Sequence, residues 1–306
     1  MSSNSVRIVE VGPRDGLQNE AAIIPAATKV ALIDRLSACG FAVVEATSFV
    51  SPKWIPQLAD AEAVLAGIRR RDGVLYPALV PNEKGLDRAL ACGVREIAVF
   101  TAASDAFNLR NIHCDVAESL RRLAPVVERG KALGLWVRGY VSTVLGCPYQ
   151  GAVPVAEVVR VATALQAMGC DEISLGDTIG VGTPAKARAM LLACAGEIPM
   201  ARLAVHFHDT YGQALANVLA CIEAGVRVVD SAVAGLGGCP YAQGASGNLA
   251  SEDLLYMLDG LGLHTGVDLD AVCATALWIN AELGREPASK LARVRMAAAD
   301  RARRAG

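Results

Sequence analysis

Short apolar runs alternate along the chain with longer, alanine-rich stretches whose apolar residues recur at helical spacing. Five of these helix-like stretches end in a glycine and lead into an apolar or β-branched run, at Gly40, Gly93, Gly134, Gly169 and Gly225. A glycine in the left-handed conformation ends a helix and turns the chain toward the next element. The repeated pattern therefore predicts consecutive units of helix and strand.

Eight apolar runs have the length and composition of β-strands: residues 7–11, 41–46, 74–79, 97–100, 136–141, 173–175, 203–208 and 228–231. Helices are expected between them, at residues 27–38, 57–70, 83–91, 117–132, 155–167, 185–195, 213–223 and 251–261. Runs that are apolar throughout are typical of a parallel sheet covered by helices. The pattern predicts an α/β fold, a single TIM (β/α)8 barrel over residues 1–306, with residues 267–306 as extra C-terminal helices. A doubly wound open sheet is the alternative.

The seventh expected strand ends in His206-Phe207-His208, which holds half of the four histidines in the chain. Residues two apart on a strand point to the same face, so both imidazoles project together and Phe207 points the other way, into the packing. Two imidazoles at a strand end offer half of a divalent-metal site. The other interpretation is one exposed and one packed histidine.

Other polar residues lie within or just after the expected strands, and a barrel places its chemistry at the carboxyl ends of its strands. The candidates are Arg14 and Asp15, Glu45 and Ser48, Arg138, Asp177 and Thr178, and Cys239 and Asn248 in the glycine-rich loop 235–248. Each also has an ordinary interpretation: a helix cap for Asp177, a surface pair for Arg14 and Asp15, an inert thiol for Cys239. Glu45 follows two valines directly, where carboxylates are seldom buried without a partner.

Composition excludes several classes of protein. The net charge is −2, from 29 basic and 31 acidic residues, and no basic face indicates nucleic-acid binding. No uncharged apolar run is long enough to span a membrane. Nine cysteines without a C-x-x-C pair indicate a reducing compartment, and we expect a cytoplasmic protein.

Three long strings resemble the 3-hydroxy-3-methylglutaryl-CoA lyase family, which belongs to the metal-dependent lyases and Claisen-type synthases built on a TIM barrel. They are residues 9–20, 45–54 and 235–248, and residues 138–142 and 145–149 add to them. The resemblance covers residues 6 to about 265. The Gly-Gly-Cys-Pro-Tyr-Ala sequence in the last string separates the lyases from their synthase relatives.

The resemblance implies the roles of individual residues. Asp15, His206, His208 and Asn248 would bind one divalent cation, Mg²⁺ or Mn²⁺. Arg14 would stabilise the enolate of the thioester, and Cys239 would be the catalytic acid. Glu45 and Asp177 match catalytic positions near the substrate hydroxyl, and the remaining residues expected to bind substrate are Ser48, Arg138 and Thr178.

The activity that the resemblance implies is cleavage of 3-hydroxy-3-methylglutaryl-CoA to acetoacetate and acetyl-CoA, as in leucine and ketone-body catabolism. Alternatives are the same cleavage of a longer branched 3-hydroxyglutaryl-CoA, a Claisen condensation, and a catalytically silent barrel that acts as a scaffold. The expected partner is an acyl-CoA, and the sequence does not assign the residues that bind CoA. We expect a homodimer, the commonest assembly, although the apolar stretch near residues 272–281 could also pack on the barrel.

Overall fold

The computed structural model describes residues 4–237 and 247–305, and its centre is a parallel sheet of nine strands. The order of the strands in the sheet is β2-β1-β9-β8-β7-β6-β5-β4-β3. The strands are β1 (Arg7–Glu10), β2 (Val43–Val44), β3 (Thr47–Ser48), β4 (Ala78–Leu79), β5 (Glu96–Ala102), β6 (Trp136–Ser142), β7 (Glu172–Asp177), β8 (Leu203–Phe207) and β9 (Val228–Ser231).

The segment from β2 to β3 closes this sheet into a barrel. Val43 and Val44 pair with β1, whereas Thr47 and Ser48 pair with β4 on the other side. Between the two pairings, the N–H of Glu45 donates to the carbonyl of Glu10, and that of Ala46 donates to the carbonyl of Pro77. Val43 also forms a bridge to Leu75, so the second predicted strand lies between β1 on one side and the third predicted strand on the other. The predicted barrel is confirmed, and the open-sheet alternative is wrong.

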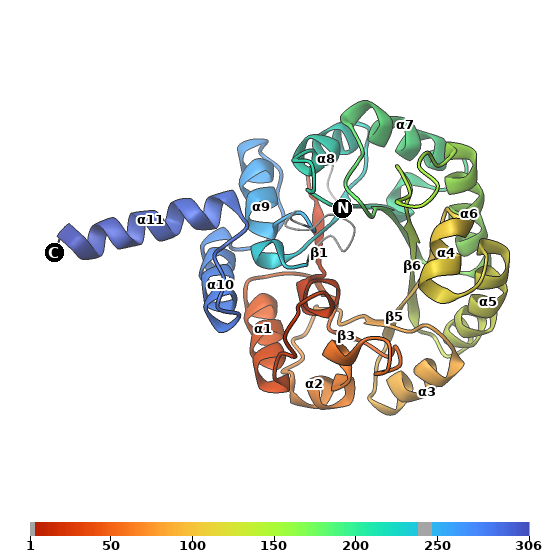
Figure 1. The fold of residues 1–306 in the computed structure, drawn as a ribbon, viewed down its shortest axis with the longest axis horizontal. Helices are drawn as coiled ribbons and strands as arrows, with labels where there is room; N and C mark the ends of the chain where they lie inside the picture. The colour runs from red at the N-terminus through yellow and green to blue at the C-terminus, as the bar shows by residue number, and fades with distance from the viewer. Residues whose placement is uncertain (1–3, 238–246, 306) are drawn as a thin grey trace.

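Helices surround the barrel as a ring (Figure 1). The described helices are α1 (Ala26–Ala38), α2 (Ala61–Gly67), α3 (Glu83–Ala91), α4 (Asp105–Ile112), α5 (Val116–Ala132), α6 (Val155–Met168), α7 (Pro184–Ala195), α8 (Ala214–Glu223) and α9 (Ser251–Gly260), and then α10 (Leu269–Glu282) and α11 (Lys290–Ala305), which lie outside the ring. Single turns form η1 (Gly12–Gly16), η2 (Pro56–Leu58), η3 (Met200–Arg202) and η4 (Val233–Gly235).

Local chemistry explains where the elements depart from the predicted boundaries. The third predicted strand is regular only over Ala78–Leu79, because Pro77 has no N–H to donate to the ladder. Helix α2 is shorter than predicted, since Ile68 adopts an extended conformation with its side chain buried. Helix α4 was not predicted, although Ser104 is a normal N-cap whose hydroxyl accepts from the N–H of Phe107.

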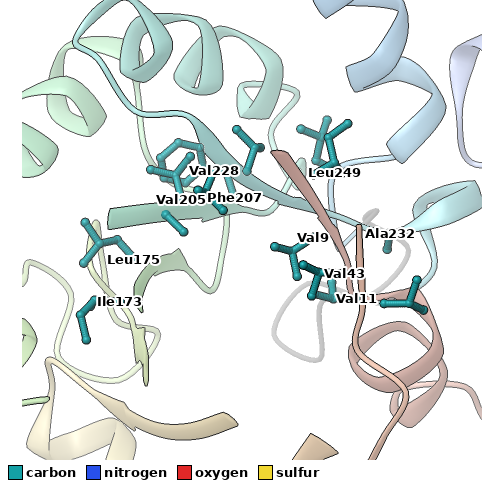
Figure 2. Packing of buried hydrophobic residues seen from close by; sticks show 14 of the residues in the cluster. Val9, Val11, Val43, Ile173, Leu175, Val205, Phe207, Val228, Ala232 and Leu249 are labelled. Atoms are coloured by element: carbon teal, nitrogen blue, oxygen red, sulfur yellow. The ribbon is translucent and has the colours of Figure 1, made fainter. Parts of the chain in front are cut away.

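Aliphatic side chains pack between the strands and the surrounding helices in one large cluster that runs from Val6 to Ala292. Figure 2 shows part of it, with Val205 and Phe207 of β8 near Leu175 of β7. Phe207 is fully buried in this cluster, as its position between the two histidines predicts. The core thus holds β8 by its apolar face and leaves the other face for polar side chains.

The C-terminal segment forms two helices outside the ring. Helix α10 packs against α1, α9 and η4, and it buries Val272, Ala276 and Ile279 there. Helix α11 extends away from the barrel in Figure 1, and Val294 on it is exposed. Within the described residues, none of the helices combines the length and the apolar character needed to cross a membrane.

Candidate metal centre and cleft

A cleft of about 950 Å³ opens at the carboxyl ends of the strands. His206 and His208 both line it, and their ring centroids lie 5.3 Å apart. The two rings share the cleft side of the chain because they are two residues apart at the end of β8. This is the arrangement that the spacing of the histidines predicts.

Asp15 reaches the histidines from η1, the single turn that follows β1. The N–H of Asp15 donates to the carbonyl of Val11, and this bond keeps the turn wound. The Asp15 Oδ2 atom lies 3.9 Å from Nε2 of His206. One ligand atom from each of Asp15, His206 and His208 lies within 4.8 Å of the other two. A single cation could therefore contact all three side chains.

Asn248 joins the group after the loop that follows β9. Its backbone forms a bridge to His208, and its Nδ2 donates to Oδ2 of Asp15 over 2.7 Å. The structure thus brings together all four predicted metal ligands, with the amide nitrogen of Asn248 facing the carboxylate.

The electrostatics of the group suit a divalent cation. Burial tends to raise the pKa of Asp15, but Arg14 and the two histidines outweigh it and lower this pKa to about 2. Burial lowers the pKa of His208 to about 4, so the ring is neutral and has a free lone pair. Nδ1 of His208 is buried and has no hydrogen-bond partner among the described residues. An anionic carboxylate and an unsatisfied imidazole nitrogen are what a cation would complete.

Arg14 lies beside the candidate metal ligands and lines the cleft. It donates to Oδ1 of Asp15 over 2.6 Å and to Oε2 of Glu45 over 2.8 Å. Its Nε has no partner among the described residues, and its guanidinium stacks over the ring of Tyr140 at 5.5 Å. Glu45 is fully buried, and Oε2 also accepts from the hydroxyl of Tyr140 over 3.0 Å. Glu45 therefore holds Arg14 in place from below.

Arg138, predicted to bind substrate, lies deeper in the barrel and is not among the residues that line the cleft. All three of its side-chain nitrogens donate hydrogen bonds. They go to Glu172, to the hydroxyl of Tyr140 and to both oxygens of Asp230. The guanidinium is thereby occupied by protein groups.

The remaining predicted site residues have different surroundings. Thr178 lines the cleft. Asp177 is buried, and its Oδ2 accepts from the N–H of Gly182, which shapes the loop after β7. Burial raises the pKa of Asp177. Ser48 is buried and accepts from the N–H of Val50. Neither Asp177 nor Ser48 lines the cleft.

Cys239 lies outside the described residues. The described residues on either side of it, Gly237 and Gly247, are joined by a hydrogen bond of 3.1 Å from the N–H of Gly247. At Gly237, φ is +108°, and a Cβ there would come within 2.8 Å of Nδ2 of Asn248. A side chain at this position would therefore displace a candidate ligand.

Two residues of the site escaped the sequence reasoning. Tyr140 lies between Arg14 and Arg138, and Asp230 on β9 contacts His206. Asp230 follows two valines in a predicted strand, which is the signal that singled out Glu45. A tyrosine inside a strand gave no comparable signal, since most are packing residues.

Comparison with known proteins places this chain in a family. A family model described as HMGL-like matches residues 5–279. The chain belongs to this family. It is 58% identical over 287 residues to the mitochondrial hydroxymethylglutaryl-CoA lyase of Bos taurus, and the match covers 94% of this chain and 88% of the relative.

The matches to two bacterial relatives cover nearly the whole length of each relative. The chain is 56% identical over 294 residues to a 3-hydroxy-3-isohexenylglutaryl-CoA/hydroxy-methylglutaryl-CoA lyase of Pseudomonas aeruginosa, covering 96% of this chain and 98% of the relative. It superposes with a TM-score of 0.91 on an HMG-CoA lyase of Acinetobacter baumannii in complex with coenzyme A and 3-methylmalate, at 39% identity and 96% coverage of each chain.

Proposed function

We propose that this chain cleaves 3-hydroxy-3-methylglutaryl-CoA to acetoacetate and acetyl-CoA with the help of a divalent cation, Mg²⁺ or Mn²⁺. The observation that supports this most directly is the position of Arg14, which lies in the cleft against Asp15 and within the same group as the two histidines. The curated relatives named above are lyases for this substrate class.

Arg14 is suited to the charge that the reaction develops. When the carbon–carbon bond breaks, its electron pair moves onto the acetyl-CoA fragment as a thioester enolate. Arginine stays protonated at working pH and presents planar donors, so Arg14 can stabilise the enolate oxygen. Its Nε is buried and has no hydrogen-bond partner among the described residues. Glu45 and Tyr140 orient the guanidinium, so it does not need to reorganise during the reaction.

Two protons move in this proposal. The substrate hydroxyl loses one to a base, a carboxylate or a water molecule, as it becomes the ketone of acetoacetate, and the enolate carbon gains one to give acetyl-CoA. A cation held by Asp15, His206, His208 and Asn248 would lower the pKa of that hydroxyl. We assign the proton donor to Cys239, two residues along the chain from Gly237. A positioned acid contributes about 100-fold to 10,000-fold in rate.

We assign supporting roles to the other predicted carboxylates. Glu45 has one oxygen, Oε1, without a partner among the described residues, and its other oxygen holds Arg14. Asp177 shapes the loop that carries Thr178 along the cleft. Thr178 remains a proposed contact of the substrate, whereas Ser48 and Arg138 would support the residues that surround it.

The proposed function is tested by incubating the purified chain with 3-hydroxy-3-methylglutaryl-CoA and Mg²⁺ and measuring both products by mass spectrometry. We expect equal amounts of acetoacetate and acetyl-CoA, and none after treatment with EDTA until Mg²⁺ or Mn²⁺ is restored. Cleavage that survives exhaustive chelation contradicts the metal centre. Condensation of acetyl-CoA with a 2-oxoacid, without cleavage, indicates a synthase instead, and no reaction with any substrate indicates a scaffold.

A longer branch at C3 of the substrate is a second candidate. Part of the cleft wall is apolar, because Leu79 and Tyr140 pack there with Val50 and Phe100. The Pseudomonas aeruginosa relative is named for both the isohexenyl and the methyl substrate. Values of kcat/KM for a series of 3-hydroxyglutaryl-CoA substrates with different branches at C3 would show which branch length the chain prefers. Leu79→Phe should lower kcat/KM more for long branches than for methyl, by about 10-fold for a crowded pocket.

Three further properties are also proposed: the acyl-CoA partner, the homodimer and the cytoplasmic location. We propose that the cleft admits an acyl-CoA, since a relative is known in complex with coenzyme A. Arg110 and Arg122 line the cleft and offer positive charge to its phosphates. We retain the homodimer, to be tested by light scattering. The eight described cysteines are free thiols, which agrees with the reducing cytoplasm expected from the sequence.

A further inference from the structure

Asp230 contacts one of the two candidate metal-binding histidines from beneath the cleft. It lies on β9 and is buried, and its Oδ2 is 3.2 Å from Nδ1 of His206. The same oxygen accepts from the hydroxyl of Ser174 over 2.9 Å. The opposite side of the His206 ring carries Nε2, which faces Asp15 at 3.9 Å. Asp230 and the candidate cation site are therefore on opposite sides of one imidazole.

Asp230 is itself held in a fixed orientation by Arg138. One guanidinium nitrogen donates to Oδ1 over 2.6 Å, and another donates to Oδ2 over 3.0 Å. The third nitrogen of Arg138 donates to Glu172 over 2.8 Å, and Glu172 also accepts from Arg7. This two-pronged ion pair fixes the plane of the carboxylate and balances its charge inside the barrel. Asp230 thus presents an acceptor, and no donor, to His206.

A neutral imidazole carries one proton, and a carboxylate can only accept it. The proton must therefore be on Nδ1, which leaves the lone pair of Nε2 directed at the cation site. We propose that Asp230 is a positioning residue of the metal centre, which holds His206 in the Nδ1–H form and fixes the direction of its Nε2. This inference rests on the metal centre of the proposed function and adds a residue to it.

The second histidine has no such support. Nδ1 of His208 is buried without a hydrogen-bond partner among the described residues, although its ring lies only 5.3 Å from that of His206. The two imidazoles are therefore unequal, because His206 has a carboxylate behind its ring and His208 has no hydrogen bond to Nδ1 among the described residues. Carboxylates behind metal-binding histidines typically contribute 10-fold to 100-fold to metal affinity. Arg138 was predicted to bind substrate. In this proposal it instead holds Asp230, which in turn orients His206.

The first test reads the tautomer of His206 directly in the full chain. Protein labelled with ¹⁵N-histidine, free of metal and at about pH 9 so that the rings are neutral, is examined by NMR. His206→Gln assigns the signals. We expect a slowly exchanging Nδ1–H and an unprotonated Nε2 for His206. An Nε2–H tautomer of His206 in the unmodified chain overturns the proposal, and this result does not depend on activity or on the folding of any variant.

The second test measures binding of Mn²⁺ alone, by electron paramagnetic resonance. In Asp230→Asn, one oxygen is replaced by NH₂, so Arg138 and Nδ1–H compete for the oxygen that remains. We expect 10-fold to 100-fold weaker Mn²⁺ binding. Glu172→Gln is the matched control, because it disturbs the same buried guanidinium without touching His206, and we expect it to bind Mn²⁺ within about 3-fold of the unmodified chain.

The outcomes separate this inference from the proposed function. Unchanged Mn²⁺ affinity in a folded Asp230→Asn variant overturns the positioning role, and so does an equal loss in both variants. If the unmodified chain binds no Mn²⁺, the metal centre and the proposed function fail, together with an inference that depends on them. If Mn²⁺ binds and the tautomer is as expected but no thioester is cleaved, only the proposed substrate fails.

Discussion

Two layers of the barrel each contain an arginine paired with carboxylates, and they differ in what the arginine has left to offer. Arg14, in the layer at the cleft, is 6% exposed and has one nitrogen without a protein partner among the described residues. Arg138, in the layer beneath, is 0% exposed, and all of its nitrogens donate to protein acceptors. The same residue type can thus face a ligand or hold the wall behind it. The role of each arginine depends on how deep it lies in the barrel and on how many of its nitrogens already donate to protein acceptors.

The largest expected effect is a loss of stability when Arg138, in the layer beneath the cleft, is replaced. Arg138→Met would leave the buried carboxylates of Asp230 and Glu172 without their shared cation, and we expect the free energy of unfolding to fall by about 3–5 kcal/mol. Urea denaturation followed by circular dichroism measures it. Arg129→Met, at an exposed ion pair with Asp87, is the control and should cost less than about 1 kcal/mol. Equal losses in the two variants would remove the distinction between a buried and a surface arginine.

Substitutions of Arg14, in the layer at the cleft, should change the rate of cleavage. Arg14→Gln removes the cation that faces the developing enolate, and we expect kcat for thioester cleavage to fall about 100-fold to 1,000-fold. Arg14→Lys keeps the positive charge but loses the planar arrangement of donors, so its kcat should lie between those of Arg14→Gln and the unmodified chain. Steady-state kinetics on both folded variants measure this. A kcat for Arg14→Gln within a few-fold of the unmodified chain would show that Arg14 holds the structure, as Arg138 does.

Tyr140 joins the two layers, so its hydroxyl tests whether they are independent. It donates to Glu45 over 3.0 Å and accepts from Arg138 over 2.8 Å. Tyr140→Phe should lower the free energy of unfolding by about 1–2 kcal/mol, because a buried charged group on each side loses one hydrogen bond. A double-mutant cycle of Tyr140→Phe with Arg14→Gln, read in kcat, would give a coupling energy. Strict additivity would mean that the layers act separately.

Glu10 extends the comparison to a buried carboxylate that forms no ion pair with an arginine of the described residues. Burial raises its pKa to about 8, although the N–H groups of Gly12 and Val233 and the hydroxyl of Ser251 favour the charged form. The folded chain therefore binds this proton more tightly than the unfolded chain. The stabilisation is complete below about pH 4.5, the ordinary pKa, and is lost as the pH rises to about 8.

The expected slope from Glu10 is at most about 1.4 kcal/mol of unfolding free energy for each pH unit in this window. Denaturation curves between pH 5 and 8 measure it. Glu252, whose pKa burial raises to about 7, adds to the same trend, so Glu10→Gln should flatten the curve only in part. A curve for Glu10→Gln that matches the unmodified chain would assign the whole trend to other groups.

Much of the fold could be predicted from local patterns. Glycine-ended helices followed by apolar runs located the strands, and the period of two at the end of β8 placed His206 and His208 on one face and Phe207 on the other. Errors occurred where one residue overrides the pattern. Pro77 shortens β4, and the N-cap at Ser104 begins a helix that the apolar spacing does not reveal.

The two histidines could be predicted as half of a metal site from their spacing, and the resemblance to the lyase family completed the set with Asp15 and Asn248. Asp15, His206, His208 and Asn248 come from distant parts of the chain, and the structure brings them together. Depth within the barrel could not be predicted in the same way. Arg138 and Glu45 are both polar residues in apolar strands, and nothing local shows which layer each occupies.

The sequence by itself determined the strand and helix order, the faces of the strands, and the residue types available for metal and enolate chemistry, since these follow from local periodicity and side-chain chemistry. Only the tertiary structure decided how those groups are paired. Hydrogen-bond partners such as Asp230 for His206 and Glu45 for Arg14 lie 24 and 31 residues away in the chain. Closure of the barrel brings those partners together, and it also decides that Arg14 lines the cleft while Arg138 lies beneath it.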